Sequence, residues 1–239
     1  MVKHVRRDGA VSTRAKRPLV LLFIAALCLG FLAPTATAGA ATAPPCPTSN
    51  ASSFAFKAVL DNGNMKIGSL ASSSGNRVDV CGLIGINADG SLSTNVDPAN
   101  VQFTGGAIKV LFLSIPASLT PAGPVTGGGG FNPDGSLSAT FTAPIQANVS
   151  LLGFNCTLGP LAPTLTTGAS GALTGQNLVP VDGTNDAKGK LVANSFGVPA
   201  IKSTRTCPFF VSGLVNLGLG LPLAPGKSSV TFDITLTLT

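Results

Sequence analysis

The chain has 239 residues and a formal net charge of +6, and it contains one His, no Trp and no Tyr. Six of its fifteen Lys and Arg residues and one of its nine acidic residues, Asp8, precede residue 39, which leaves nine basic and eight acidic residues beyond it. This balance leaves no basic stripe for a nucleic acid. Because no imidazole follows His4, Ser-His-Asp and Cys-His nucleophile systems are excluded, and zinc and copper sites are disfavoured. We therefore expect a protein without catalytic activity, cofactor or nucleic-acid partner.

The first 38 residues have the parts of a secretory signal peptide. Six basic residues precede the apolar run 19–32, and small residues follow it up to Ala38. The apolar run is shorter than the roughly 20 residues that span a bilayer, which favours a Sec-type signal peptide over a retained membrane anchor. Cleavage is expected after Ala38, with Ala43 as the alternative, so the remaining chain is expected to be secreted.

Four cysteines follow the expected signal peptide: Cys46, Cys81, Cys156 and Cys207. An even number of cysteines in an exported chain indicates two disulfides. Three pairings are possible, and we prefer Cys46 with Cys81 and Cys156 with Cys207, because each bond then ties one half of the chain to itself. Metal ligation by these cysteines is disfavoured, because none of them form a C-x-x-C pair.

Beyond residue 38, short apolar or alternating runs are separated by Gly, Pro, Asn, Asp and Ser, and no long run has the helical period of 3.6. Short strands at intervals of roughly 8 to 15 residues predict an all-β fold, an antiparallel β-sandwich of the Ig-like or jelly-roll-like type. Residues 208–217 are apolar throughout and can form a short helix. The expected strands are residues 53–60, 65–70, 77–87, 91–95, 101–104, 107–115, 136–143, 145–156, 162–168, 172–178, 187–199 and 228–239.

Turn residues divide these strands. The segments NADGSLST at 87–94 and NPDGSLSA at 132–139 each predict a tight Asp-Gly hairpin followed by an alternating strand. NGN at 62–64 predicts another tight turn. The glycine-rich residues 120–133 are expected to be flexible, either as a long loop or as a boundary between two packed sub-domains within residues 39–239.

Alternation of apolar and polar residues also predicts the core. In the C-terminal strand, for example, Phe232, Ile234 and Leu236 alternate with Thr and Asp. The expected core residues are Phe54, Phe56, Leu60, Val78, Val80, Ile84, Ile86, Val110, Phe112, Leu137, Phe141, Val149, Leu151, Leu191, Phe196, Phe232, Ile234 and Leu236.

Two further patterns allow a functional interpretation. Asp182, Asn185 and Asp186 group oxygen ligands that suit Ca²⁺, although a polar turn explains them without a metal. Residues 110–112 and 151–154 are apolar in both alternating registers. Such strands are covered on both faces or else line a lipid pocket or a partner surface, and we favour coverage by a second sheet.

The runs FNCTLGPLAPTLTTGASGALTG and TRTCPFFVSGLVNLGLGLPLAPGKSSVTFDITLTL resemble the C-terminal part of uncharacterised secreted β-rich proteins of actinobacteria. The resemblance covers residues 136–239. It implies an exported protein of a Gram-positive bacterium and supports the pairing of Cys156 with Cys207. It carries no activity over to this chain.

These patterns predict a secreted or cell-envelope structural or binding module, with a cell-envelope component or an apolar small molecule as its partner. The alternative is an extracellular carrier that holds an apolar ligand, such as an envelope lipid, between its sheets. An Asp pair in a cleft would instead indicate a hydrolase. The oligomeric state is not predicted.

Overall fold

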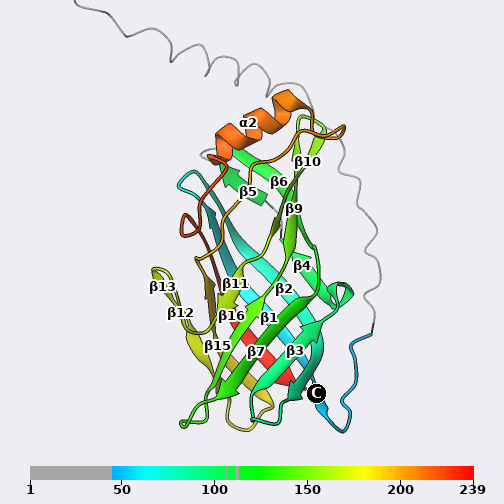
Figure 1. The fold of residues 1–239 in the computed structure, drawn as a ribbon, viewed down its shortest axis with the longest axis vertical. Helices are drawn as coiled ribbons and strands as arrows, with labels where there is room; N and C mark the ends of the chain where they lie inside the picture. The colour runs from blue at the N-terminus through cyan, green and yellow to red at the C-terminus, as the bar shows by residue number, and fades with distance from the viewer. Residues whose placement is uncertain (1–44, 106, 111–112) are drawn as a thin grey trace, which may run out of the picture. The chain divides into compact units, whose positions relative to one another are not determined.

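The structure is a computed structural model that describes residues 45–239 except residues 106, 111 and 112, so the expected signal peptide at 1–38 lies outside the described residues (Figure 1). The described elements are β1 (Ser53–Ile67), β2 (Ala71–Ile86), β3 (Leu92–Val96), η1 (Pro98–Asn100), β4 (Val101–Thr104), β5 (Ala107–Val110), β6 (Leu113–Pro121), β7 (Val125–Phe131), β8 (Leu137–Thr142), β9 (Ile145–Leu151), β10 (Phe154–Leu161), β11 (Thr164–Thr166), β12 (Ala169–Ser170), β13 (Leu173–Thr174), β14 (Gln176–Pro180), β15 (Asp186–Ala193), α2 (Phe209–Leu219) and β16 (Ser228–Leu238).

Eight of these strands close into a barrel. The order around the ring is β1, β16, β15, β11, β8, β7, β3 and β2, and the ring closes because β1 pairs with both β16 and β2. Every pairing in the ring is antiparallel. The expected all-β antiparallel fold is confirmed, but the expected sandwich is wrong, because one sheet curls around its own apolar face and needs no second sheet to cover it.

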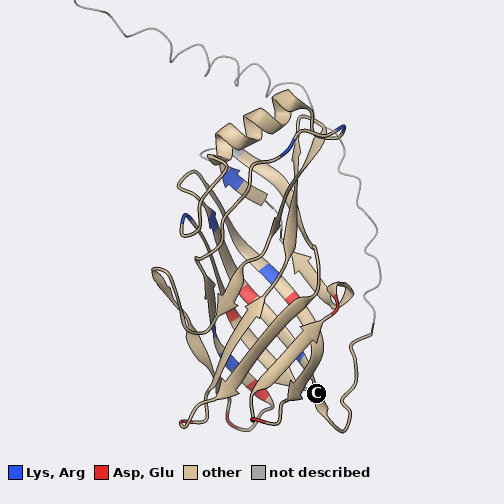
Figure 2. Cartoon of the chain, viewed as in Figure 1, with Lys and Arg blue, Asp and Glu red and all other residues tan. Residues whose placement is uncertain are grey.

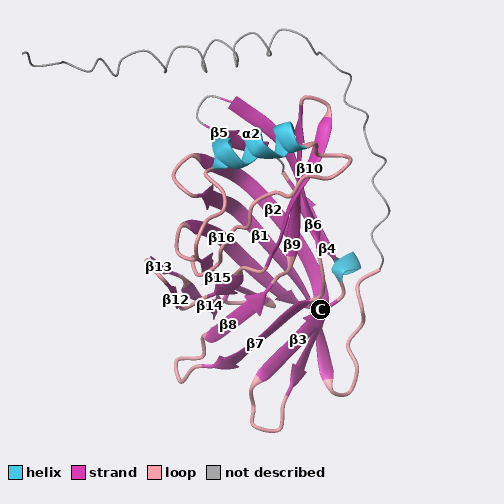
Figure 3. Ribbon diagram, turned by 45° about the horizontal axis from the view of Figure 1, so that its top comes forward, coloured by secondary structure: helices cyan, strands magenta, loops and turns pink. Residues whose placement is uncertain are grey.

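Additional strands extend the barrel. β5 pairs with the first residues of β2, and β6, β9 and β10 continue the sheet from β5. β4 pairs with the middle of β2, while β14 pairs with both β15 and β8. Helix α2 lies at the end of the molecule where β5, β6 and β10 are found (Figures 1 and 3). Strands β5, β6, β9 and β10 therefore extend the sheet at the α2 end, whereas β14 lies at the opposite end.

Several expected strand boundaries differ from the structure; the expected strand 187–199, for example, ends at Ala193 as β15. Three boundaries are wrong for local reasons. Residues 62–64 do not turn the chain, because β1 passes through them as a bulge in which Asn62 has φ 53°. Residues 107–115 form the two strands β5 and β6, and residues 145–156 form β9 and β10. Between β9 and β10 the chain turns at Leu152 and Gly153, which have φ values of 55° and 78°.

The glycine-rich residues 125–131 form strand β7, so the expectation of a flexible loop across 120–133 is wrong, while the alternative of a sub-domain boundary there stays a prediction. β7 pairs with β3 on one side and with β8 on the other. A Cβ atom on Gly127 would overlap the ring of Phe141, and one on Gly129 would overlap the carbonyl oxygen of Ser138. Glycine within a strand commonly marks such a close approach, so these glycines fit β7 into the barrel wall.

Gly129→Ala is therefore expected to lower the free energy of unfolding by about 1 to 3 kcal/mol, since backbone has to move to make room for the methyl group. Gly130→Ala is the matched control, because a Cβ atom there meets no heavy atom within 4 Å. Urea unfolding followed by far-ultraviolet circular dichroism measures both variants. Equal midpoints for the two variants would contradict this account of β7.

Both expected disulfides are present with the preferred pairing. One joins Cys46 to Cys81 in β2, and the other joins Cys156 in β10 to Cys207, which lies just before α2. The short helix expected at 208–217 is confirmed as α2. It ends at Gly220, which has φ 70°, and the N–H of Leu221 donates to the carbonyl oxygen of Asn216.

Candidate functional site

A pocket of about 460 Å³ lies inside the barrel at the end opposite α2. The pocket and α2 lie at opposite ends of β1. Phe54 near the start of β1 borders the pocket, whereas Gly68 just after the end of β1 lies beside Leu219 of α2. Pockets for small ligands commonly have volumes of roughly 300 to 1,000 Å³. This pocket therefore has the size of a ligand site, and we call it the mouth pocket.

The mouth pocket is lined by the last inward-facing side chains of the barrel strands. Ile86 of β2 is paired with Leu92 of β3, and Phe131 of β7 with Leu137 of β8. Four large apolar side chains of the lining are strongly exposed: Phe54 at 53%, Ile86 at 53%, Phe131 at 69% and Leu238 at 43%. Large side chains of this kind are mostly buried in folded proteins, so their gathering at one opening needs an explanation.

The expectation that Phe54 and Ile86 are buried core residues is wrong. Both side chains belong to the inward-facing register that the alternation predicts, but they lie where the barrel is open. Phe56, two residues further into the barrel on β1, is only 4% exposed. Phe112, another expected core residue, lies outside the described residues. Most other expected core residues are buried or pack against the core.

Three hairpin turns surround the mouth pocket, and two of them confirm the Asp-Gly prediction. In the first, the Asp89 carboxylate accepts hydrogen bonds from the N–H and the hydroxyl of Ser91, at 2.9 and 2.6 Å. Asp134 and Ser136 repeat this arrangement with the same distances. These hydrogen bonds lower the pKa of both carboxyl groups below their ordinary value. The turns at this end consequently carry fixed negative charge at neutral pH.

The third turn contains the residues considered for Ca²⁺. The Asp186 carboxylate accepts a hydrogen bond from the Thr237 hydroxyl at 2.6 Å, and the backbone carbonyl of Asn185 accepts one from the N–H of Leu238. The Thr184 hydroxyl donates to the Val181 carbonyl at 2.9 Å. Within the described part of the chain, no group of three or more His, Cys, Asp or Glu residues is placed to hold a metal. The polar groups named here serve the turn and its contact with β16.

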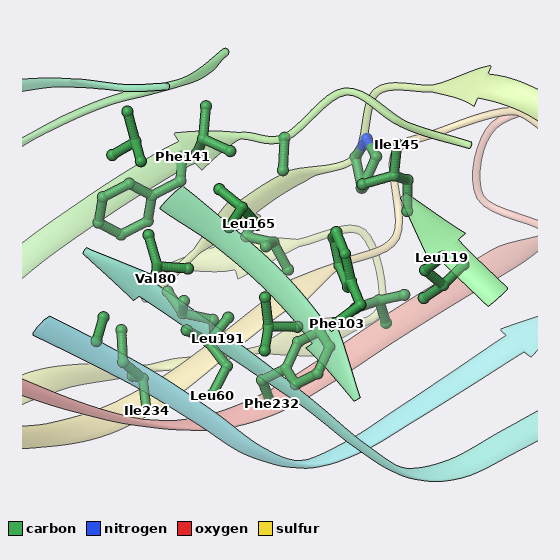
Figure 4. A pocket seen from close by; sticks show the side chains of 18 of the residues that line it. Leu60, Val80, Phe103, Leu119, Phe141, Ile145, Leu165, Leu191, Phe232 and Ile234 are labelled. Carbon is green, nitrogen blue, oxygen red and sulfur yellow. The ribbon is translucent and has the colours of Figure 1, made fainter. Parts of the chain in front are cut away.

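A second cavity of about 80 Å³ lies deeper in the barrel, and apart from Thr94 it is lined by apolar residues (Figure 4). Figure 4 shows Leu60, Leu191 and Phe232 among the side chains that surround it. This inner cavity is smaller than the 150 Å³ or so of an engineered cavity that binds benzene. It is therefore too small to be a ligand site by itself.

Leu236 of β16 lies between the cavities. Its side chain lines the mouth pocket, the inner cavity and a void of about 30 Å³ that shares residues with both. Phe141 borders the inner cavity and the small void. The barrel thus contains a row of apolar spaces, with Leu236 between the open one and the enclosed one.

Sequence reasoning missed the mouth pocket as a site. Phe131 lies in the stretch that was expected to be a loop, and Leu238 was not included in the expected core. The expected site residues, the four cysteines, form the two disulfides and do not line this pocket. The sequence contains one signal for the pocket: the alternation of inward-facing apolar residues in β2 and β16 continues almost to the last residue of each strand.

The fold and the pocket define a class: a closed antiparallel β-barrel with an apolar pocket at one end. No family model, curated protein or solved structure matches the chain. Among the residues that the structure describes, no helix has both the length and the apolar character needed to cross a membrane. The two disulfides are compatible with an extracellular protein. The expected actinobacterial family stays a prediction.

Proposed function

We propose that this chain is a secreted, non-enzymatic binding module that takes an apolar ligand into the mouth pocket and carries or sequesters it. One observation supports this above all: Phe54, Ile86, Phe131 and Leu238 are exposed together in one pocket of ligand size. Leaving four large apolar side chains uncovered costs stability in a folded protein. A ligand that covers them recovers that free energy on binding.

The proposed ligand site differs from the one that the sequence suggested. An apolar ligand held between two sheets requires a sandwich, whereas here one closed sheet surrounds the space. The ligand would enter along the barrel from its open end. Apolar side chains from β1, β2, β7 and β16 would contact it on several sides.

The surroundings of the mouth also indicate the charge of the ligand. Asp89, Asp134 and Asp182 lie in the three hairpin turns, whose residues 87–91, 132–136 and 181–186 include no Lys or Arg. Because like charges repel, these carboxylates disfavour a ligand with an anionic group at the opening. The ligand class that fits best is a neutral, lipid-like molecule.

The geometry of the pocket supports a hydrolase less well than a binding protein. A carboxylate-based hydrolase requires two carboxyl groups in one cleft. Asp186 is the acidic residue that borders the mouth pocket, and its carboxylate is hydrogen-bonded to Thr237. A binding role uses the apolar lining, which is the larger part of the pocket.

Ile86→Asp is expected to weaken binding of the neutral fluorophore N-phenyl-1-naphthylamine by at least roughly tenfold, because an ionised carboxylate would have to lose water inside an apolar pocket. Val179→Asp is the matched control. Val179 is 57% exposed, close to the 53% of Ile86, but it does not line the mouth pocket. Fluorescence titration of the parent chain and both variants measures the dissociation constants.

Loss of binding in Ile86→Asp alone supports the proposal. Equal affinities for the two variants would show that the probe binds elsewhere. Absence of saturable binding in the parent chain would favour a purely structural role. Both variants are expected to fold, because each replaced side chain is more than half exposed.

A further inference from the structure

Helix α2 exposes a second apolar surface, at the opposite end from the mouth pocket. Val211, Val215 and Leu219 recur every four residues and face the core. The opposite side of the helix is also apolar: Phe209 is 83% exposed, Phe210 61%, Leu214 42% and Leu217 75%. We call these four residues the α2 face.

The α2 face differs from the outer side of an ordinary surface helix, which carries charged and polar residues. The sequence of α2, FFVSGLVNLGL, contains no charged residue. Phe210 meets Phe154 of β10 edge to face, with ring centroids 5.7 Å apart. Leu70 and Leu152, exposed at 39% and 42%, lie beyond the ends of β1 and β9 at this end of the molecule. A group of exposed apolar side chains at one end of a molecule is typical of an interaction site.

Basic residues surround the α2 face. The side chain of Asn216 in α2 bonds both the N–H and the carbonyl of Ile201, at 2.8 and 3.0 Å, which holds the exposed Lys202 beside the helix. Arg205 follows in the same segment, just before Cys207. The remaining basic residues at this end, all exposed, are Lys66 of β1, Lys109 of β5 and Lys227, which precedes β16.

The strand registers explain why these cations lie at one end. Lys66 and Lys109 are both paired with Ser72 of β2, one on each side, and Lys227 precedes Ser228, which is paired with Ile67. Figure 2 shows basic residues in the loops and strand ends near α2, whereas acidic residues lie along the barrel wall and at the turns of the opposite end. In the described part of the chain, five of nine basic residues thus lie at the α2 end, whereas the eight acidic residues lie in barrel strands, in the three mouth turns or at the start of η1.

We propose that the α2 end docks on an anionic lipid surface. The α2 face would enter the boundary between headgroups and acyl chains, and the surrounding Lys and Arg side chains would contact the negatively charged headgroups. An interfacial helix binds by its buried apolar area together with attraction to anionic lipids. Each Lys or Arg near such a surface strengthens binding by about fivefold. This inference is independent of the proposed ligand pocket.

A second copy of the chain is the competing occupant of the α2 face, and the charges argue against it. A two-fold dimer through α2 would bring the same surface patch of both copies together. Lys202, Arg205 and Lys227 of one copy would then approach those of the other, and no acidic side chain described at this end could offset the repulsion. An anionic lipid surface would bury the apolar α2 face and attract the surrounding cations at the same time.

Sedimentation with vesicles tests the proposal. The full chain is produced in a secreting host, and residues 1–44 are the same in every variant, so differences between variants report on the α2 end. The parent chain is expected to bind vesicles of equal parts phosphatidylglycerol and phosphatidylcholine more tightly than vesicles of phosphatidylcholine alone. Added salt should reduce the difference, because the cations are exposed.

Two variants separate the apolar and the charge contributions. Phe209→Ser with Leu217→Ser should weaken binding to the anionic vesicles by roughly tenfold or more. Lys202→Gln, Arg205→Gln and Lys227→Gln together should weaken it by about fivefold for each cation removed. The matched controls are Val179→Ser on β14, which is 57% exposed and does not line the mouth pocket, and Lys188→Gln with Lys190→Gln on the barrel wall; both should bind as the parent does.

Equal binding to the two kinds of vesicle, or unchanged binding in both α2-end variants, would overturn the proposal. So would native mass spectrometry showing a parent dimer that the change of Phe209 and Leu217 to Ser dissociates, in a chain that does not sediment with vesicles. If the apolar variant fails to fold, the charge variant still decides, because it changes exposed side chains outside the helix.

Discussion

Replacement of Cys156 and Cys207 by Ala is expected to lower the free energy of unfolding by about 4 kcal/mol. The disulfide joins residues separated by 51 positions in the sequence, and closing a loop of this length removes much of the freedom of the unfolded chain. Strands β11 and β15, which complete the barrel wall between β8 and β16, lie inside this loop. The bond therefore restricts the part of the chain that closes the ring.

Urea unfolding of the double variant measures this effect, and the parent chain in reductant, which loses both disulfides, measures the combined loss. Cys46→Ala with Cys81→Ala is the matched control, because that disulfide spans 35 positions and is expected to contribute nearly as much. An unchanged unfolding midpoint in the Cys156 and Cys207 variant would show that the bond does not constrain the unfolded chain. A much larger loss than in the control would point to packing of the two buried cysteines as an additional contribution.

Leu236→Ala is expected to cost about 2 to 5 kcal/mol of unfolding free energy, because it removes three buried carbon atoms and leaves a cavity. Leu236 is 6% exposed, and its partners in the neighbouring strands, Ala58 and Ala187, are too small to fill the space. The same change joins the mouth pocket to the inner cavity. Under the proposed function, a ligand with a longer alkyl chain should then bind more tightly, by about fourfold for each methylene group that enters.

Leu191→Ala is the matched control for this variant. Leu191 is 1% exposed and lines the inner cavity, but it does not line the mouth pocket. Both variants should lose similar stability in urea unfolding. In titrations with naphthylamine probes that carry short or long alkyl chains, Leu236→Ala alone should favour the longer chain. A preference that is the same in both variants would argue against Leu236 as the separation between the two spaces.

The sequence predicts this fold best where the information is local. NADGS and NPDGS form hairpins with the same hydrogen bonds, because an Asp side chain and a Gly with positive φ determine such a turn within five residues. The alternation of Phe232, Ile234 and Leu236 correctly predicts an integral strand with a buried face. The even number of cysteines beyond residue 38 correctly predicts two disulfides.

Prediction fails where the outcome depends on distant parts of the chain. Alternation of apolar and polar residues is the same in a sandwich and in a barrel. The fold is a barrel because β1 pairs with both β2 and β16. The glycines of β7 read as a loop because the Phe141 ring and the Ser138 carbonyl that require them lie on another strand. The mouth pocket was missed for the same reason, since only the closed ring shows that Phe54 and Ile86 lie at its opening.

Closure of the barrel also bears on how the protein avoids self-association. Strands in the ring have hydrogen-bonding partners on both sides, and the path of strands that leaves the ring ends at β10, which pairs with β9 alone. Pro160 lies within β10 and lacks an N–H group, and the pairing register of β10 with β9 shifts between Leu158 and Leu161. An interrupted edge is a poor template for strands of other molecules. The interruption at Pro160 therefore disfavours edge-to-edge pairing of β10 with strands of other molecules.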